Sequence, residues 1–159
     1  PKNMLKNTPQ VRETCRKQLF DSFLKNGYVF ADGILTKYVS QKLGVYKTQS
    51  LVDNTTAYVV EKKGQYAHGK TVKEANIDLR FNLAKDRGAE QYKKIDKIKP
   101  QTVEYWITAY RVITGACKMG VEQFLARTTL KKDKYTLKEV LRITNGAYAS
   151  EKFTGFFRK

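Results

Sequence analysis

One eight-residue stretch of the sequence matches a phosphate-binding pattern. Residues 64–71 read Gly-Gln-Tyr-Ala-His-Gly-Lys-Thr, which fits the pattern G-x-x-x-x-G-K-[ST]. In a phosphate loop of this kind, backbone N–H groups surround the phosphates, Lys70 would reach the terminal phosphate, and Thr71 would hold Mg²⁺. The stretch is therefore the first candidate for chemistry in this chain.

Three features of the surrounding sequence argue against nucleotide binding there. A phosphate loop follows a strand of a parallel sheet, whereas the strands predicted upstream form antiparallel hairpins. After Thr71, no apolar strand ends in an Asp that would serve as a second Mg²⁺ ligand. Thr71 and Glu74 also form the pattern of a helix capping box. We therefore expect a turn followed by a capped helix, and no cofactor.

Other candidates for catalysis or metal binding are few. The chain has one histidine, His68, and two cysteines, Cys15 and Cys117. A nucleophilic pair of Cys117 and His68 has no local signature, and three such residues cannot supply a four-ligand zinc site. Glu74 and Asp78 share a helix face, as ordinary salt-bridged surface groups do. We expect buried free thiols, no metal site and no catalytic residues.

The charge of the chain indicates the class of its partner. Lys and Arg total 31 and Asp and Glu total 15, a net charge of +16 over 159 residues. Residues 1–50, 51–100 and 101–159 carry +6, +4 and +6, so the excess is not confined to a tail. Solubility alone needs a net charge of only about 2–8 in a small domain. The excess favours nucleic acid or an acidic, nucleic-acid-loaded protein as partner.

Four groups of cations are the candidate contacts with such a partner, because phosphate binding requires only positive charge at a suitable spacing. They lie on the first predicted helix, beside a predicted turn, and in two lysine-rich stretches of the second half. The candidate binding residues are Arg12, Arg16, Lys17, Lys62, Lys63, Lys93, Lys94, Lys97, Lys99, Lys131, Lys132, Lys134 and Lys138.

Four tyrosines alternate with lysines in a pattern that would suit base stacking, although half-buried strands also use Tyr. They are Tyr46, Tyr58, Tyr66 and Tyr92. No sequence motif of a known RNA- or DNA-reading domain is present.

Composition and length favour a folded domain. Hydrophobic residues make up 41% of the chain and aromatic residues 12%, which is enough for a core. No apolar run approaches the roughly 20 residues of a membrane span. The first residues carry no secretion signal, so we expect a reducing, cytoplasmic location and no membrane partner.

The first half of the chain predicts a helix followed by an antiparallel meander. Thr8 and Pro9 favour a helix start. Residues 9–25 are predicted to be helical, with Val11, Cys15, Leu19 and Phe23 facing inward. Short strands are predicted at residues 28–31, 34–39, 45–48, 57–60 and 65–67. Asp32-Gly33 between the first two is a strong hairpin signal.

Helices dominate the rest of the chain. The capping box at Thr71 begins a helix with Val72, Ala75, Leu79 and Leu83 inward. Further helices are predicted at residues 102–114 and 116–127, after a second capping box at residues 136–139, and at the end of the chain. The predicted fold class is α+β. We expect residues 1–88, a basic linker at 89–100 and a helical segment at 101–159, packed as one domain.

The second half also resembles a group of small proteins encoded by phages and mobile elements of Bacteroidetes-type bacteria. Residues 110–117, Tyr-Arg-Val-Ile-Thr-Gly-Ala-Cys, carry the resemblance together with Gly120 and Phe124. It extends over residues 28–157, with Ala-His-Gly-Lys-Thr at residues 67–71 matching the middle of the group. Ala149 stands where the group leads us to expect Gly.

This resemblance implies a phage-type accessory protein acting in a bacterial cytoplasm, and we predict no enzymatic activity for it. Small proteins of this kind often inhibit host defence, which implies an anti-CRISPR-like inhibitor of an RNA-guided nuclease, acting on the host effector or its guide RNA. The alternative is direct, non-specific binding of DNA or RNA. Exposed Phe153, Phe156 and Phe157 would favour a protein interface, whereas their burial would favour a role in the core.

Overall fold

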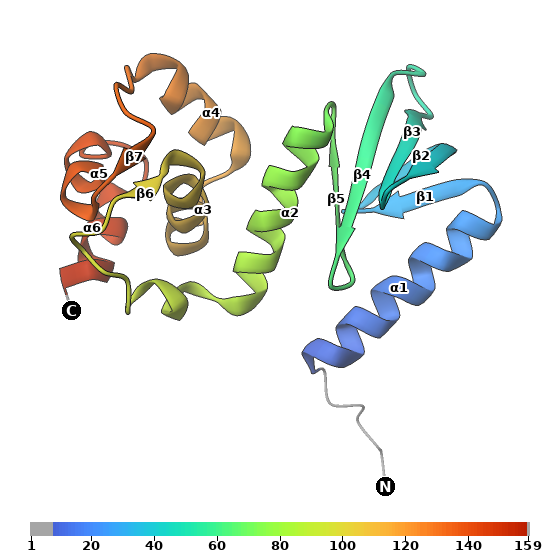
Figure 1. Cartoon of the computed structure of the whole chain (residues 1–159), viewed down its shortest axis with the longest axis horizontal. Coiled ribbons are helices and arrows are strands. Elements are labelled where there is room, and N and C mark those ends of the chain that lie inside the picture. The colour runs from blue at the N-terminus through green and yellow to red at the C-terminus, as the bar shows by residue number, and fades with distance from the viewer. Residues whose placement is uncertain (1–7, 159) are drawn as a thin grey trace, which may run out of the picture. The chain divides into compact units, whose positions relative to one another are not determined.

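The computed structural model describes residues 8–158 and has the expected mixture of helix and sheet (Figure 1). An N-terminal helix is followed by a five-stranded antiparallel meander and then by helices, so the α+β prediction is confirmed. The contacts divide the chain into two compact units, Pro1–Asn82 (unit 1) and Leu83–Lys159 (unit 2). The sequence predicts segments 1–88, 89–100 and 101–159 packed as one domain, and this packing stays a prediction.

Helix α1 (Pro9–Lys25) begins where its sequence signals placed it. The N–H of Val11 donates to the Thr8 hydroxyl at 3.3 Å, so Thr8 caps the helix. The inward face differs from the prediction, because Phe20 and Leu24 pack against the sheet while Cys15 and Leu19 are exposed. A four-residue spacing advances 400° and drifts 40° per step, so the predicted row winds away from the contact face.

The sheet of unit 1 is a simple meander in the order β1-β2-β3-β4-β5, with every pair antiparallel. Its strands are β1 (Tyr28–Ala31), β2 (Ile34–Lys42), β3 (Val45–Ser50), β4 (Thr56–Lys62) and β5 (Gln65–Gly69). Asp32 and Gly33 join β1 to β2 with φ of 53° and 77°, as the hairpin signal requires. Phe20 stacks on Tyr66 at a centroid distance of 4.1 Å and fixes α1 to the sheet.

Helix α2 (Val72–Arg87) follows β5 at once, and the unit boundary falls within it. Ala75 and Leu79 are buried as expected, but Val72 is exposed at the helix start. The side-chain amide of Asn82 donates to the carbonyl of Tyr66 at 3.3 Å, which ties the helix to β5.

Unit 2 holds more structure than the sequence predicted. A 3₁₀ helix, η1, occupies Ala89–Tyr92 within the expected linker, and Tyr92 is buried in the core of the unit. Two short strands, which we did not expect, form a small sheet. The remaining elements are β6 (Gln101–Thr102), α3 (Val103–Thr114), α4 (Lys118–Arg127), β7 (Lys134–Tyr135), α5 (Leu137–Ile143) and α6 (Ser150–Arg158).

Aromatic side chains form the centre of the core of unit 2. Trp106 and Tyr110 of α3 are buried. Phe153 is fully buried against Tyr110 and Phe157, at centroid distances of 4.7 and 5.2 Å. Phe156 is half-buried and packs against the same core. The three phenylalanines therefore belong to the core and do not form an exposed patch.

Candidate functional site

The segment that matches the phosphate-binding pattern is a strand between two turns. Gly64 lies in the tight turn of the β4–β5 hairpin, and the next five residues form β5. Five strand residues span about 16 Å, so Gly64 and Lys70 lie at opposite ends of β5 and cannot surround one phosphate. The Thr71 hydroxyl accepts a hydrogen bond from the N–H of Glu74 at 3.2 Å, and the Glu74 carboxylate accepts one from the N–H of Lys70 at 2.9 Å. Thr71 therefore caps the start of α2, as predicted.

His68 and the two cysteines lie in different environments. Both ring nitrogens of His68 are buried without a hydrogen-bond partner in the described part of the chain. Burial lowers the pKa of His68, although the Asp32 carboxylate opposes the shift. Cys15 and Cys117 are free, but the prediction that they are buried is wrong, since both are exposed. Cys15 lies off the packed face of α1, and Cys117 caps α4 by accepting the N–H of Gly120 at 3.3 Å.

Residues 8–158 contain no group of three or more His, Cys, Asp or Glu side chains arranged to hold a metal ion. None of the helices in this range has the length and apolar composition needed to cross a membrane.

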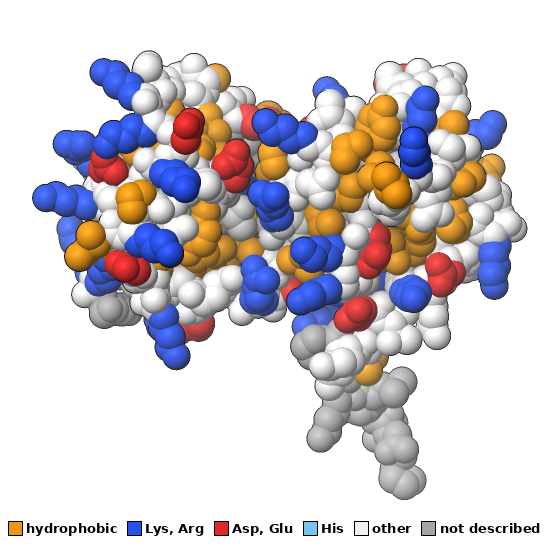
Figure 2. Space-filling view, in the orientation of Figure 1, with side chains coloured by type: hydrophobic (Ala, Val, Ile, Leu, Met, Phe, Trp, Pro, Cys, Tyr) orange, Lys and Arg blue, Asp and Glu red, His pale blue; other side chains and the backbone are white. Residues whose placement is uncertain are grey.

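The candidate cations of unit 1 do not share one environment. The Arg16 guanidinium donates to the carbonyl of Gly64 at 2.9 Å and links α1 to the β4–β5 turn, so this residue has a structural role. Lys17, Lys62 and Lys63 are exposed. Figure 2 shows Lys and Arg side chains over both units, with Asp and Glu side chains between them.

Two candidate lysines of unit 2 meet in one pocket. Lys97, which follows η1, and Lys138 of α5 line a hollow of about 520 Å³ together with two arginines, Arg142 and Arg158. No Asp or Glu side chain lines it. We call this hollow the basic pocket; its remaining lining residues are Leu137, Leu141, Asn145, Thr154 and Phe157.

Some of the cations of the basic pocket interact with the C-terminal ends of α5 and α6. The Lys97 ammonium donates to the carbonyl of Phe157 at 3.2 Å, near the end of α6. Arg142 and Arg158 lie in the last turns of α5 and α6. A helix C-terminus carries about half a negative charge, so two ends offset about one of the four cations. About three positive charges remain for an external anion.

Other candidate cations of unit 2 already have anionic partners. Lys93 pairs with Glu90 at 2.8 Å, and Lys132 pairs with Glu139. Hydrogen bonds from Lys132 and from the N–H of Thr136 lower the pKa of Glu139 to about 2. Both lysines therefore contribute less to an external anion than the basic pocket does. The remaining candidates of this unit are exposed: Lys94, Lys99, Lys131 and Lys134.

Sequence reasoning missed Arg142, Arg158, Asn145 and Thr154. A usable signal was present, because Lys138 and Arg142 lie four residues apart on one helix and their side chains share a face. The burial of two tyrosines was also missed: Tyr66 and Tyr92 lie in the two cores and are not available to stack on bases. Tyr46 and Tyr58 are half-buried.

No protein-family model, curated protein or solved structure matches this chain. The functional argument therefore depends on the geometry and charge of the described residues.

Proposed function

We propose that this protein binds nucleic acid directly, through phosphate contacts centred on the basic pocket. The observation that carries the proposal is the convergence of Lys97, Lys138, Arg142 and Arg158 on one hollow that no carboxylate lines. Arg matches the geometry of phosphate oxygens through paired N–H donors, and Lys adds a compact charge. The side chains of Asn145 and Thr154 add neutral hydrogen-bonding groups.

The charge around the pocket favours a polyanion over a single small anion. Unit 2 carries 17 basic and 8 acidic residues, a net charge of +9, and further exposed lysines, among them Lys94, Lys99, Lys131 and Lys134, lie outside the pocket. A chain of phosphates would contact several of these cations at once and release bound counterions. Contacts of this kind read the backbone and carry no base sequence, so we expect non-specific binding.

A second candidate is the role implied by the resemblance to phage-encoded proteins, an inhibitor that binds an RNA-guided nuclease in a bacterial cytoplasm. An exposed apolar patch would have favoured the inhibitor hypothesis, but Phe153 and Phe157 are buried and Phe156 packs against the same core. An inhibitor would use the same cations, against guide RNA or an acidic protein surface. A tagged pull-down with and without nuclease separates the two, because a protein partner that persists after nuclease treatment would favour the inhibitor.

The test of direct binding is fluorescence anisotropy with a labelled single-stranded RNA and a labelled DNA duplex over a range of salt concentrations. The affinity should fall linearly in log–log form as salt rises. The double variant Lys138→Ala/Arg142→Ala should weaken binding and reduce the salt slope on single strands by about 1.4, since each lost contact contributes about 0.7.

The matched control is Lys62→Ala/Lys63→Ala, which removes two exposed cations from unit 1 and changes the net charge equally. It should have a smaller effect on affinity. Equal losses in both variants would show that net charge alone drives binding and would contradict the basic pocket as its centre. Absence of binding at low salt would overturn the proposal as a whole.

A further inference from the structure

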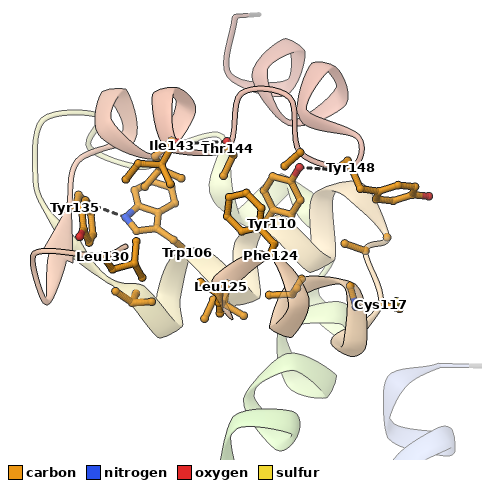
Figure 3. A pocket seen from close by; sticks show the side chains of 18 residues that line it. Trp106, Tyr110, Cys117, Phe124, Leu125, Leu130, Tyr135, Ile143, Thr144 and Tyr148 are labelled. Carbon is orange, nitrogen blue, oxygen red and sulfur yellow. Dashed lines mark hydrogen bonds between the residues drawn. The ribbon is translucent and has the colours of Figure 1, made fainter. Parts of the chain in front are cut away.

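Unit 2 contains a second hollow, which is apolar. It shares no lining residue with the basic pocket, although α5 contributes different residues to each. It has a volume of about 460 Å³ and is lined by α3, α4, α5 and the segments between them (Figure 3). Trp106, Tyr110 and Phe124 contribute rings to its wall, and Leu125, Leu130 and Ile143 contribute aliphatic groups. We call it the apolar cavity.

Three polar side chains that line the apolar cavity already have hydrogen-bond partners within the protein. The Trp106 indole N–H donates to the carbonyl of Tyr135 at 2.7 Å, and the Tyr110 hydroxyl donates to the carbonyl of Tyr148 (Figure 3). The Thr144 hydroxyl donates to the carbonyl of Val140 at 2.9 Å. A polar ligand would lose its hydrogen bonds to water here and find few replacements, which is costly.

The lining also excludes charged ligands. No Lys, Arg, His, Asp or Glu side chain lines the cavity, although unit 2 as a whole carries +9. A charged group inside would therefore be desolvated without an ionic partner. The uncharged lining of the cavity therefore favours an uncharged ligand.

Helix α4 forms one wall of the cavity and is packed only in part against the core of unit 2, which Val121 contacts. Its apolar residues Val121, Phe124 and Leu125 all line the cavity, yet no residue of α4 is buried. An amphipathic helix normally buries this face against its neighbours. An apolar molecule in the cavity would supply the missing contact for α4.

We propose that the apolar cavity binds an uncharged, apolar small molecule with one or two aromatic rings. Its volume lies in the range of ligand sites, about 300–1,000 Å³, and well above the roughly 150 Å³ of an apolar cavity that takes up benzene. The rings of Trp106, Tyr110 and Phe124 favour aromatic partners through edge and face contacts. This ligand site is independent of nucleic-acid binding.

The test uses N-phenyl-1-naphthylamine, an uncharged apolar fluorophore, with the whole protein. Trp106 is the only tryptophan of the chain and lies in the cavity wall, so its emission is sensitive to a probe bound in the cavity. Binding should quench Trp106 with transfer of energy to the probe, and the affinity should not change with salt. Absence of saturable quenching up to the solubility limit of the probe would overturn the proposal.

A filling variant places the probe more sharply. Val121→Phe should occupy part of the cavity and weaken probe binding at least about tenfold, whereas Val52→Phe, the same change at a position 95% exposed in unit 1, should leave it unchanged. Ala147→Leu is a second filling variant, should Val121→Phe fail to fold. Unchanged probe affinity in a folded filling variant would contradict binding in this cavity.

The two exposed thiols provide an internal control without mutation. Cys117 lines the cavity, whereas Cys15 lies on α1 in unit 1. Saturating probe should slow alkylation of Cys117 by iodoacetamide, measured by peptide mass spectrometry, and leave the rate at Cys15 unchanged. Equal rates at Cys117 with and without the probe would place the probe elsewhere and overturn the proposal.

Discussion

Ala149 adopts a left-handed backbone conformation, with φ of 56°, directly before α6. This is the position at which the resemblance led us to expect Gly. The left-handed conformation costs a residue with a Cβ about 1–2 kcal/mol, whereas Gly adopts it freely at an entropic cost of about 0.5–1 kcal/mol. The turn before α6 therefore keeps its left-handed conformation although Ala149 is less favourable there than Gly.

We expect Ala149→Gly to stabilise unit 2 by up to about 1 kcal/mol. Urea denaturation followed by Trp106 fluorescence measures this, because the only tryptophan lies in that unit. As a control, Ala126→Gly within the exposed surface of α4 should destabilise by about 1 kcal/mol. A loss of stability in Ala149→Gly would contradict the assigned backbone conformation.

We expect the stability of unit 1 to depend on pH through His68. Burial lowers its pKa in the folded protein, so the neutral form is favoured by folding. The contribution of neutral His68 to the free energy of unfolding is fully present above the pKa of about 6.5 that the residue has in the unfolded chain. It is lost as pH falls through and below that value. Urea denaturation followed by circular dichroism should show falling stability from about pH 7.5 to about 5.5. His68→Gln should remove most of this slope, since His68 is the only histidine; a persisting slope would assign it to another group.

At the scale of elements, the junction of β5 and α2 depends on close contact of backbone atoms. A Cβ added to Gly69 would lie 2.3 Å from the backbone nitrogen of Ala75, which cannot move without shifting α2. Glycine is therefore required here by packing and not by a phosphate. The sequence pattern G-K-T that suggested nucleotide binding marks the turn from a strand into a capped helix.

We expect Gly69→Ala to destabilise unit 1 by about 1–3 kcal/mol, the usual range for overpacking. Its neighbour Lys70 is exposed, so Lys70→Ala should leave the melting temperature nearly unchanged. Thermal denaturation with and without ATP and Mg²⁺ completes the comparison. Stabilisation by nucleotide that disappears in Lys70→Ala would refute the structural assignment of this segment.

At the scale of the whole molecule, the net charge of +16 acts on folding as well as on binding. Unit 1 carries 14 basic and 7 acidic residues and unit 2 carries 17 and 8, so both experience repulsion among their own cations. Such repulsion destabilises compact states and is screened by salt. The charge therefore has a cost for folding, which is consistent with a role for it in binding.

We expect the melting temperature to rise between about 10 and about 150 mM NaCl, over which the screening length falls from about 30 to about 8 Å. The rise should be smaller in Lys62→Ala/Lys63→Ala, whose net charge is lower. Differential scanning calorimetry measures both. A constant or falling melting temperature would show that attractive ion pairs outweigh repulsion.

The order and type of most elements followed from the sequence, because their signals are local. The caps at Thr8, Thr71 and Thr136 and the turn at Asp32-Gly33 act on neighbouring backbone groups, and each forms as predicted. The strands β2 and β3 run further than predicted, since pairing with neighbours extends a strand beyond its own propensity.

Only the tertiary structure decided which face of α1 is buried, that both cysteines are exposed, and which cations share a pocket. Lys97 and Lys138 lie far apart in the chain, and their meeting depends on how η1, α5 and α6 pack. The apolar cavity likewise arises from the incomplete burial of α4, which the amphipathic sequence of that helix does not reveal. The sequence determined the local hydrogen bonds and the excess of charge, and packing between distant segments determined which cations share the basic pocket and which apolar side chains line the cavity.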